Sequence, residues 1–139
     1  VAYHTSGELR SYGGGPNFDS YSPNAKKHMD AAMQQQLIHG YYACTSFIDA
    51  QVGRLLAELK KQGLEKDTVI VLWGDHGWHL GDHGLWCKHT NFEQATRSPL
   101  ILASPGFPKA GKTDAPTEFV DLFPTLCELV GVPIPGNLD

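Results

Sequence analysis

The chain has 139 residues, 41% of them hydrophobic, and a formal net charge of -4 at neutral pH. This length suits a single domain, and no run approaches the roughly 18 consecutive apolar residues of a membrane-spanning helix. The negative net charge provides no basic patch, so nucleic acid is not an expected partner.

We do not recognise a signal peptide at the beginning of the chain. The sequence opens on Val1 instead of Met, and no charged and then apolar leader follows, so we expect a processed chain or a fragment without its own secretion signal. The three cysteines are widely spaced and form no CxxC, which predicts free, mostly buried thiols and neither a disulfide framework nor a zinc knuckle. They are Cys44, Cys87 and Cys127.

Residues 1–29 show no hydrophobic periodicity and contain two clusters of turn-forming residues, at 11–16 and 21–24. Such a long stretch without its own periodicity is uncommon in a compact small domain. We predict that residues 1–29 form an irregular segment draped over a surface, and that residues 30–139 are part of an α/β domain.

A long helix is predicted for residues 30–62, because apolar side chains recur there at spacings of three and four. Lys60 and Lys61 suit the negative end of the helix dipole, and Gly63 suits a C-terminal cap. The stripe predicts one buried face. Its members are Leu37, Tyr41, Cys44, Ile48, Val52, Leu55 and Leu59.

The second half of the chain predicts two strands and a helix. Residues 68–73 are apolar on both faces, as is typical of a strand buried inside a parallel sheet, and residues 99–103 predict another strand. Residues 120–130 predict a short helix with Asp121 as its cap and Gly131 at its end. This order is an α/β pattern, but two strands make a thin sheet, so we expect a slice of a larger domain.

The richest chemistry lies in residues 74–88, directly after the first predicted strand. Open α/β sheets hold ligands at the carboxyl ends of their strands. Asp75 and His76 can both turn towards one ion there, the carboxylate suiting Ca²⁺ or Mg²⁺ and the imidazole suiting softer metals. The alternative is a capping aspartate with a core-facing histidine. Gly74 and Gly77 favour a functional role, because glycine lets the backbone turn and approach a bound group.

Two other features of this loop were weighed. His79 and His83 are four residues apart, as zinc ligands on one helical face are, but the intervening Gly81 disfavours a helix and no His-Glu-x-x-His pattern is present. We therefore expect these histidines to bind backbone groups or to line the rim of the loop. Lys88 is either a solvated surface lysine or a fixed cation that neutralises a sulfuryl or phosphoryl group, or the leaving oxygen.

Residues 74–92, GDHGWHLGDHGLWCKHTNF, resemble the second signature of type I sulfatases, especially the iduronate-2-sulfatase-like branch. The segment GYYACTSFIDAQVGRLL at 40–56 is similar to the helix that precedes this signature. The segments ATRSPLI at 95–101 and VDLFPTL at 120–126 are similar to the strand and helix that follow it. The resemblance covers about residues 37–131.

The resemblance implies an alkaline-phosphatase-like α/β fold, of which this chain would hold part of the large mixed sheet and its flanking helices, and one bound Ca²⁺. Asp75 would ligate the ion, and His76 would lie at the metal and the sulfate. Lys88 would contact the sulfate ester and stabilise the departing oxygen. The implied substrate is a sulfated carbohydrate or another sulfate ester. The implied location is periplasmic, secreted or lysosomal.

Elements of the family pattern are missing from this sequence. No cysteine stands in the C/S-x-P-S-R motif whose first residue becomes the formylglycine nucleophile, and no two aspartates are adjacent. The family's Lys-x-His element is also taken to be missing, although Lys26-Lys27-His28 has that spacing. The chain therefore corresponds to roughly the third quarter of a sulfatase. We expect the formylglycine upstream, in the remainder of the sulfatase chain, and expect this fragment alone to be inactive.

Two alternatives remain open. A phosphonate monoester or phosphodiester hydrolase of the same superfamily shares the Asp-His-Gly sequence and the downstream lysine. A non-catalytic module that binds Ca²⁺ or a polyanion would explain the missing nucleophile.

Overall fold

The chain, described by a computed structural model, divides into two compact units. The first comprises Val1–Arg54 and Trp73–Pro99, and the second comprises Leu55–Leu72 and Leu100–Asp139. The structure describes residues 8–11, 29–107 and 109–138. Within that part of the chain, no helix has the length and apolar character needed to cross a membrane.

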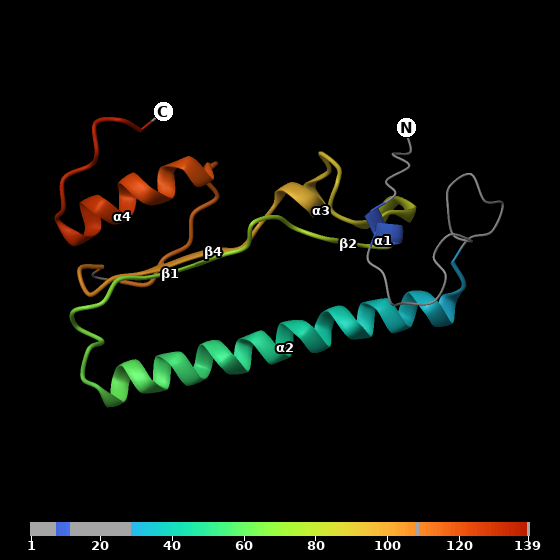
Figure 1. Ribbon diagram of the computed structural model, residues 1–139, viewed down its shortest axis with the longest axis horizontal. Helices are drawn as coiled ribbons and strands as arrows, with labels where there is room; N and C mark the ends of the chain where they lie inside the picture. The colour runs from blue at the N-terminus through green and yellow to red at the C-terminus, as the bar shows by residue number, and fades with distance from the viewer. Residues whose placement is uncertain (1–7, 12–28, 108, 139) are drawn as a thin grey trace. The chain divides into compact units, whose positions relative to one another are not determined.

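Helix α2 (Ala31–Lys61) confirms the long helix predicted from the apolar spacing, and it is drawn without interruption in Figure 1. It ends at Gly63, whose φ of 71° lies in the left-handed region. The amide of Gly63 donates to the carbonyl of Lys60 at 3.0 Å, and the amide of Leu64 donates to that of Leu59 at 3.1 Å. These two bonds are the Schellman pair, so the predicted glycine cap is confirmed.

The prediction that the apolar stripe of α2 forms core is wrong for the described structure. No residue of α2 is buried, and Ile48 and Leu55 are 57% and 71% exposed. Periodicity predicts which side chains share a face, but burial also requires a second surface against that face. The described residues cover the stripe only in part.

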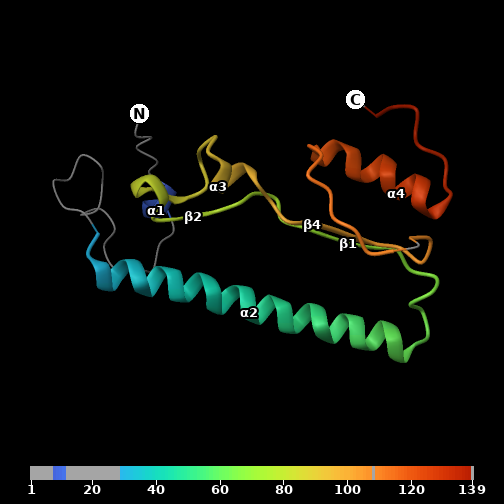
Figure 2. The same ribbon diagram turned by 180° about the vertical axis from the view of Figure 1, so that it is seen from behind.

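Strands β1 (Ile70–Trp73) and β4 (Leu100–Ala103) pair with each other in a two-stranded sheet, as both views of the ribbon show (Figures 1 and 2). Both predicted strands are therefore confirmed. The expectation of a strand buried on both faces is wrong, because no residue of β1 is buried and Trp73 is 51% exposed. Burial on both faces requires other elements packed on each side of the sheet, and the described residues leave β1 partly exposed.

The hydrogen bonds next to this sheet show that the segments flanking the strands are antiparallel. The amide of Gly74 donates to the carbonyl of Pro99 at 3.0 Å, and that of Gly77 donates to the carbonyl of Ala95 at 2.7 Å. As the residue number of the donor rises from 74 to 77, that of the acceptor falls from 99 to 95, so the two segments run in opposite directions. The apolar pattern of residues 68–73 is typical of a strand in a parallel sheet, whereas these bonds indicate antiparallel pairing with the second strand.

A small hairpin follows in the first unit. Strands β2 (His79–Leu80) and β3 (Trp86–Cys87) are antiparallel, with His79 opposite Cys87 and Leu80 opposite Trp86. The 3-10 turn η2 (Asp82–Gly84) connects them. Gly81 stands before this turn with a φ of 103°, a conformation that glycine adopts without steric cost. The expectation that glycines exclude a longer helix here is confirmed.

Two short helices complete the first unit. Helix α3 (Glu93–Thr96) lies between the hairpin and β4. Helix α1 (Glu8–Ser11) is the described part of the segment predicted to be irregular, and it contacts β3. Residues 1–7 and 12–28 of that segment lie outside the described residues.

The second unit ends with the 3-10 turn η3 (Phe119–Asp121) and helix α4 (Leu122–Val130). Asp121 does not cap α4 as predicted, because its side chain makes no cap bond to that helix. Its Oδ2 instead accepts the amide of Glu118 at 3.1 Å, in a capping box at the start of η3. Gly131 ends α4 with a φ of 72°, as predicted. Leu122 and Cys127 are the buried residues of α4.

Candidate functional site

The three residues singled out from the sequence lie in the first unit, on the chain between β1 and α3. Asp75 and His76 follow β1 after Gly74, and Lys88 follows β3 directly. Antiparallel pairing of β2 with β3 turns the chain back on itself, so continuing the observed register sets residue 88 opposite residue 78. The Lys88 ammonium indeed lies 5.5 Å from the centre of the Trp78 ring. The hairpin thus returns Lys88 to the neighbourhood of the Asp-His pair.

Asp75 and His76 meet through their side chains. The Nε2 of His76 lies 3.4 Å from Oδ2 of Asp75, and the Nδ1 of His76 lies 2.8 Å from the carbonyl oxygen of Gly77. A carbonyl oxygen only accepts hydrogen bonds, so Nδ1 carries a proton and donates to it. The His76 ring thus lies between the Gly77 carbonyl and the Asp75 carboxylate, with one ring nitrogen near each.

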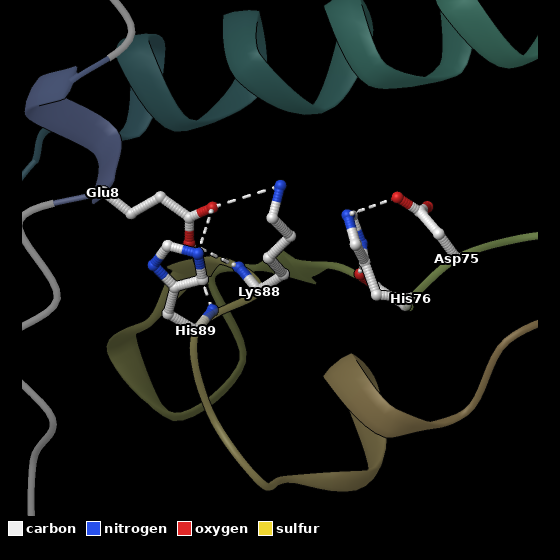
Figure 3. Close-up of polar contacts among 6 residues, drawn as sticks. Glu8, Asp75, His76, Lys88 and His89 are labelled. Carbon is white, nitrogen blue, oxygen red and sulfur yellow. Dashed lines mark hydrogen bonds and ion pairs between the residues drawn. The ribbon is translucent and has the colours of Figure 1, made fainter. Parts of the chain in front are cut away.

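Lys88 is not a solvated surface lysine. Its side chain is 26% exposed, and its Nζ lies 3.4 Å from Oε1 of Glu8, whose own side chain is 2% exposed. Figure 3 shows the Lys88 side chain between the Glu8 carboxylate and the His76 ring, with Asp75 beyond His76. The His76 ring also stacks on Trp78, with ring centres 5.9 Å apart. Lys88 and His76 are therefore neighbours of the same indole.

Glu8 is the residue that sequence reasoning missed. Its Oε2 accepts the backbone amides of Lys88 at 2.9 Å and His89 at 3.1 Å, and its Oε1 lies 3.5 Å from Nε2 of His89. The residue stands in a segment without periodicity, 80 positions before its partner, and a single glutamate there carries no motif. Only the packing of α1 on β3 brings its carboxylate to the loop.

His79 and His83 do not join the Asp75–His76 pair. His79 is fully buried, and its Nε2 lies 2.7 Å from the Thr90 hydroxyl. Burial lowers the pKa of His79, and the charge of nearby Asp82 opposes that shift only in part. His79 thus meets a side-chain hydroxyl instead of the expected backbone group.

The ring of His83 stacks on Phe92 with centres 4.8 Å apart. Across the described ranges, no three or more His, Cys, Asp or Glu side chains gather in a group that could hold a metal ion.

Two glycines flank the Asp-His pair, where the backbone bends. Neither Gly74 nor Gly77 has a positive φ, so neither uses the left-handed conformation that glycine permits. A Cβ on Gly77 would lie 2.1 Å from the carbonyl oxygen of Gln94 and 2.9 Å from that of Arg97. Gly77 is therefore needed for close packing of the loop on the backbone of α3.

Comparison with known proteins adds the family context of this site. The family model described as Sulfatase matches residues 9–132. A sulfatase of Formosa agariphila is 43% identical over 110 residues, covering 79% of this chain and 22% of that protein. Human iduronate 2-sulfatase is 38% identical over 127 residues, covering 73% of this chain and 23% of that protein.

Two solved structures are similar as well. A protein in complex with its substrate D-glucosamine-2-N,6-O-disulfate superposes with a TM-score of 0.70 at 32% identity, covering 94% of this chain and 25% of its own. A phosphonate monoester hydrolase from Silicibacter pomeroyi superposes with a TM-score of 0.74 at 36% identity, covering 84% of this chain and 23% of its own. The chain thus spans about a quarter or less of the length of these proteins.

Proposed function

The chain belongs to the sulfatase family and has part of its alkaline-phosphatase-like α/β fold, and from this premise we propose that it is a portion of a sulfate-ester hydrolase. The observation that carries this proposal is that Lys88 and His76 lie beside the Trp78 indole, with Asp75 in contact with His76. The half-buried ammonium of Lys88 suits an anionic ester.

Lys88 is the residue we assign to the chemical step. When the S–O bond of a sulfate ester breaks, negative charge develops on the departing oxygen, and a fixed ammonium beside that oxygen stabilises the charge. The contact strengthens as the bond breaks, so it acts on the transition state more than on the bound substrate. Trp78 below the ammonium limits the positions available to it.

Asp75 and His76 fit one side of a calcium site. The Asp75 carboxylate is 86% exposed and offers the hard oxygen that Ca²⁺ prefers, whereas imidazole is a poor calcium ligand. Oδ2 of Asp75 and Nε2 of His76 lie 3.4 Å apart, so one ion at the carboxylate would also lie near the imidazole. Calcium would supply positive charge against a bound sulfate. Because Ca²⁺ takes six to eight oxygen ligands, the other ligands would come from the remainder of the protein.

The nucleophile is not among the residues of this chain. None of the three cysteines stands in the C/S-x-P-S-R context, so the formylglycine of the family would be contributed by the remainder of the sulfatase chain. Within the portion in hand, residues 30–139 would belong to the catalytic α/β domain, and residues 1–29 would run over its surface. The 139 residues alone would hydrolyse no ester.

The sulfated compound bound by one solved neighbour favours a sulfated carbohydrate as the substrate class. The family also favours a periplasmic, secreted or lysosomal location. A phosphonate monoester hydrolase is the second candidate, because such an enzyme superposes on this chain as well as the sulfated-sugar complex does. A non-catalytic module that binds Ca²⁺ or a polyanion is a weaker candidate, because the missing nucleophile is its main support.

The test is the full-length protein assayed on an aryl sulfate and on the phosphonate monoester of the same phenol. We expect a higher kcat/KM on the sulfate. A preference for the phosphonate would establish the second candidate, and hydrolysis of neither ester would reject both.

A further inference from the structure

We propose that Glu8 is a positioning residue for Lys88, an assignment that rests on the proposed function of Lys88. The carboxylate of Glu8 binds both the backbone and the side chain of the same lysine. Its Oε2 accepts the Lys88 amide at 2.9 Å, and its Oε1 lies 3.4 Å from the Lys88 ammonium. One group thus determines both where the lysine stands and where its charge points (Figure 3).

The backbone around Lys88 needs such an external contact. Cys87, directly before it, has a φ of 69°, a left-handed conformation that is sterically costly for a residue with a Cβ. Such conformations persist only where the surrounding structure enforces them. The Glu8 carboxylate accepts the two amides that follow Cys87, those of Lys88 and His89, and so holds the chain just beyond the strained residue.

Burial gives this contact its strength. The Glu8 side chain is 2% exposed, and in such surroundings a charge-assisted hydrogen bond is screened little by water. The carboxylate also has to be compensated where it lies, which the two amides, the Lys88 ammonium and the His89 ring provide. The ammonium is held at one end by Glu8 and lies over Trp78. A preorganised charge of this kind does not have to be oriented during the reaction.

Glu8 reaches this position from a different part of the sequence. Helix α1 packs on β3, the strand that ends directly before Lys88. A change in how α1 packs on β3 would therefore move Lys88, although α1 itself contacts no substrate. This distinguishes a positioning residue from one that binds the ester itself.

The experiment is a double-mutant cycle in the full-length protein with Glu8→Gln and Lys88→Ala. The glutamine keeps an oxygen for the backbone amides and loses the charge that orients the ammonium. We expect Glu8→Gln alone to lower kcat on an aryl sulfate about tenfold or more with little change in KM. In the Lys88→Ala background the same substitution should change kcat less than about twofold, because coupled groups are not additive.

Glu93→Gln is the matched control, since Glu93 is 73% exposed and pairs with Arg97 at 3.9 Å on the surface. It should leave kcat and the melting temperature unchanged. If Glu8→Gln lowers the melting temperature, the cycle is repeated with Glu8→Asp, which keeps the charge and shortens the reach by one methylene. Equal effects of the Glu8 substitution with and without Lys88 would overturn the positioning role.

A second readout does not depend on catalysis. Lys88 reacts with an amine reagent only when it leaves its ion pair, so Glu8→Gln should accelerate its modification severalfold, measured by peptide mass spectrometry. The exposed Lys60 and Lys61 at the end of α2 serve as internal references. If Glu8→Gln accelerates labelling but the full-length protein has no sulfatase activity, the proposed function is rejected and the positioning of Lys88 by Glu8 is retained. If the labelling of Lys88 is unchanged, the positioning role of Glu8 is rejected, whatever the activity.

Discussion

At the scale of single residues, Lys88 is where structure and proposed chemistry meet. We predict that Lys88→Ala in the full-length enzyme lowers kcat on an aryl sulfate by about 10²–10³, the usual loss when one preorganised electrostatic group is removed. The defect should grow on an alcohol that leaves poorly, since more charge then develops on its oxygen. Steady-state kinetics on both esters measures it, with the exposed Lys66→Ala as control. Near-wild-type turnover on both would exclude the catalytic role.

Asp75 supports a prediction about metal binding. Its exposed carboxylate would contribute one charged oxygen to the calcium site, and an amide in its place keeps an oxygen without the charge. Asp75→Asn should therefore weaken Ca²⁺ binding about 10–100-fold or more, since even partners of metal ligands contribute on that scale, and should abolish turnover. Calorimetric titration of the metal-free protein measures the affinity, with the exposed Asp67→Asn for comparison. Wild-type affinity in Asp75→Asn would contradict the assignment.

Cys87 predicts how stability depends on pH. Its side chain is 1% exposed, and burial, reinforced by the nearby Glu8 carboxylate, raises the pKa of the thiol to about 11. The unfolded chain therefore loses this proton at lower pH than the folded chain does. Stability should be unaffected below the unfolded pKa near 9 and should fall between about pH 9 and 11.

Urea unfolding midpoints of the full-length protein across this pH range test the prediction. The decrease of the urea midpoint with rising pH should be smaller in Cys87→Ala, which has no thiol to ionise at this position. Equal slopes in the two proteins would show that Cys87 does not contribute to the alkaline loss of stability.

At the scale of elements, the packing of the Asp-His loop on α3 depends on the absence of one side chain. The methyl group of Gly77→Ala would meet the carbonyl oxygens of Gln94 and Arg97, which are backbone atoms that cannot rotate away. We expect a loss of roughly 1–3 kcal/mol or more in unfolding free energy, as overpacking typically causes. Chemical denaturation of the full-length protein, with and without the substitution, measures this loss of unfolding free energy.

Gly111→Ala is the control for this substitution, because no described atom lies within 4 Å of a Cβ at that position. It should leave stability unchanged or raise it slightly, since alanine restricts the unfolded chain. A Gly77→Ala protein as stable as Gly111→Ala would mean that α3 moves aside readily.

At the scale of the whole molecule, the described residues bury few apolar side chains. The buried hydrophobic set is Leu85, Cys87, Ala95, Leu122 and Cys127. Large apolar side chains on α2 and near α4 stay exposed, including Leu55 at 71% and Val120 at 70%. Elements with uncovered apolar faces have little free energy to offset the entropy of folding.

We therefore predict that residues 1–139, expressed alone, melt without cooperativity and bind a hydrophobic dye. Calorimetry, dye fluorescence and size-exclusion chromatography measure this, with the full-length protein as the reference. A cooperative melt of a compact monomer would contradict it.

The sequence by itself determined the features that depend on neighbours along the chain. The helix of α2 and its glycine cap, the strands β1 and β4, and the helix of α4 with its own glycine end all follow from local spacing and residue type. The motif in residues 74–92 likewise identified the family and singled out Asp75, His76 and Lys88. Their roles in catalysis and metal binding stay predictions.

Only the tertiary structure decided which surfaces are covered and which distant residues meet. Apolar spacing predicts a face but not the surface against it, so the stripe of α2 and the faces of β1 were wrongly expected to be buried. Gly77 was expected to turn the backbone, yet it makes room for the carbonyls of α3. Glu8 carries no sequence signal at all. Its meeting with Lys88 arises because α1 packs on β3, and such long-range contacts leave no local trace in the sequence.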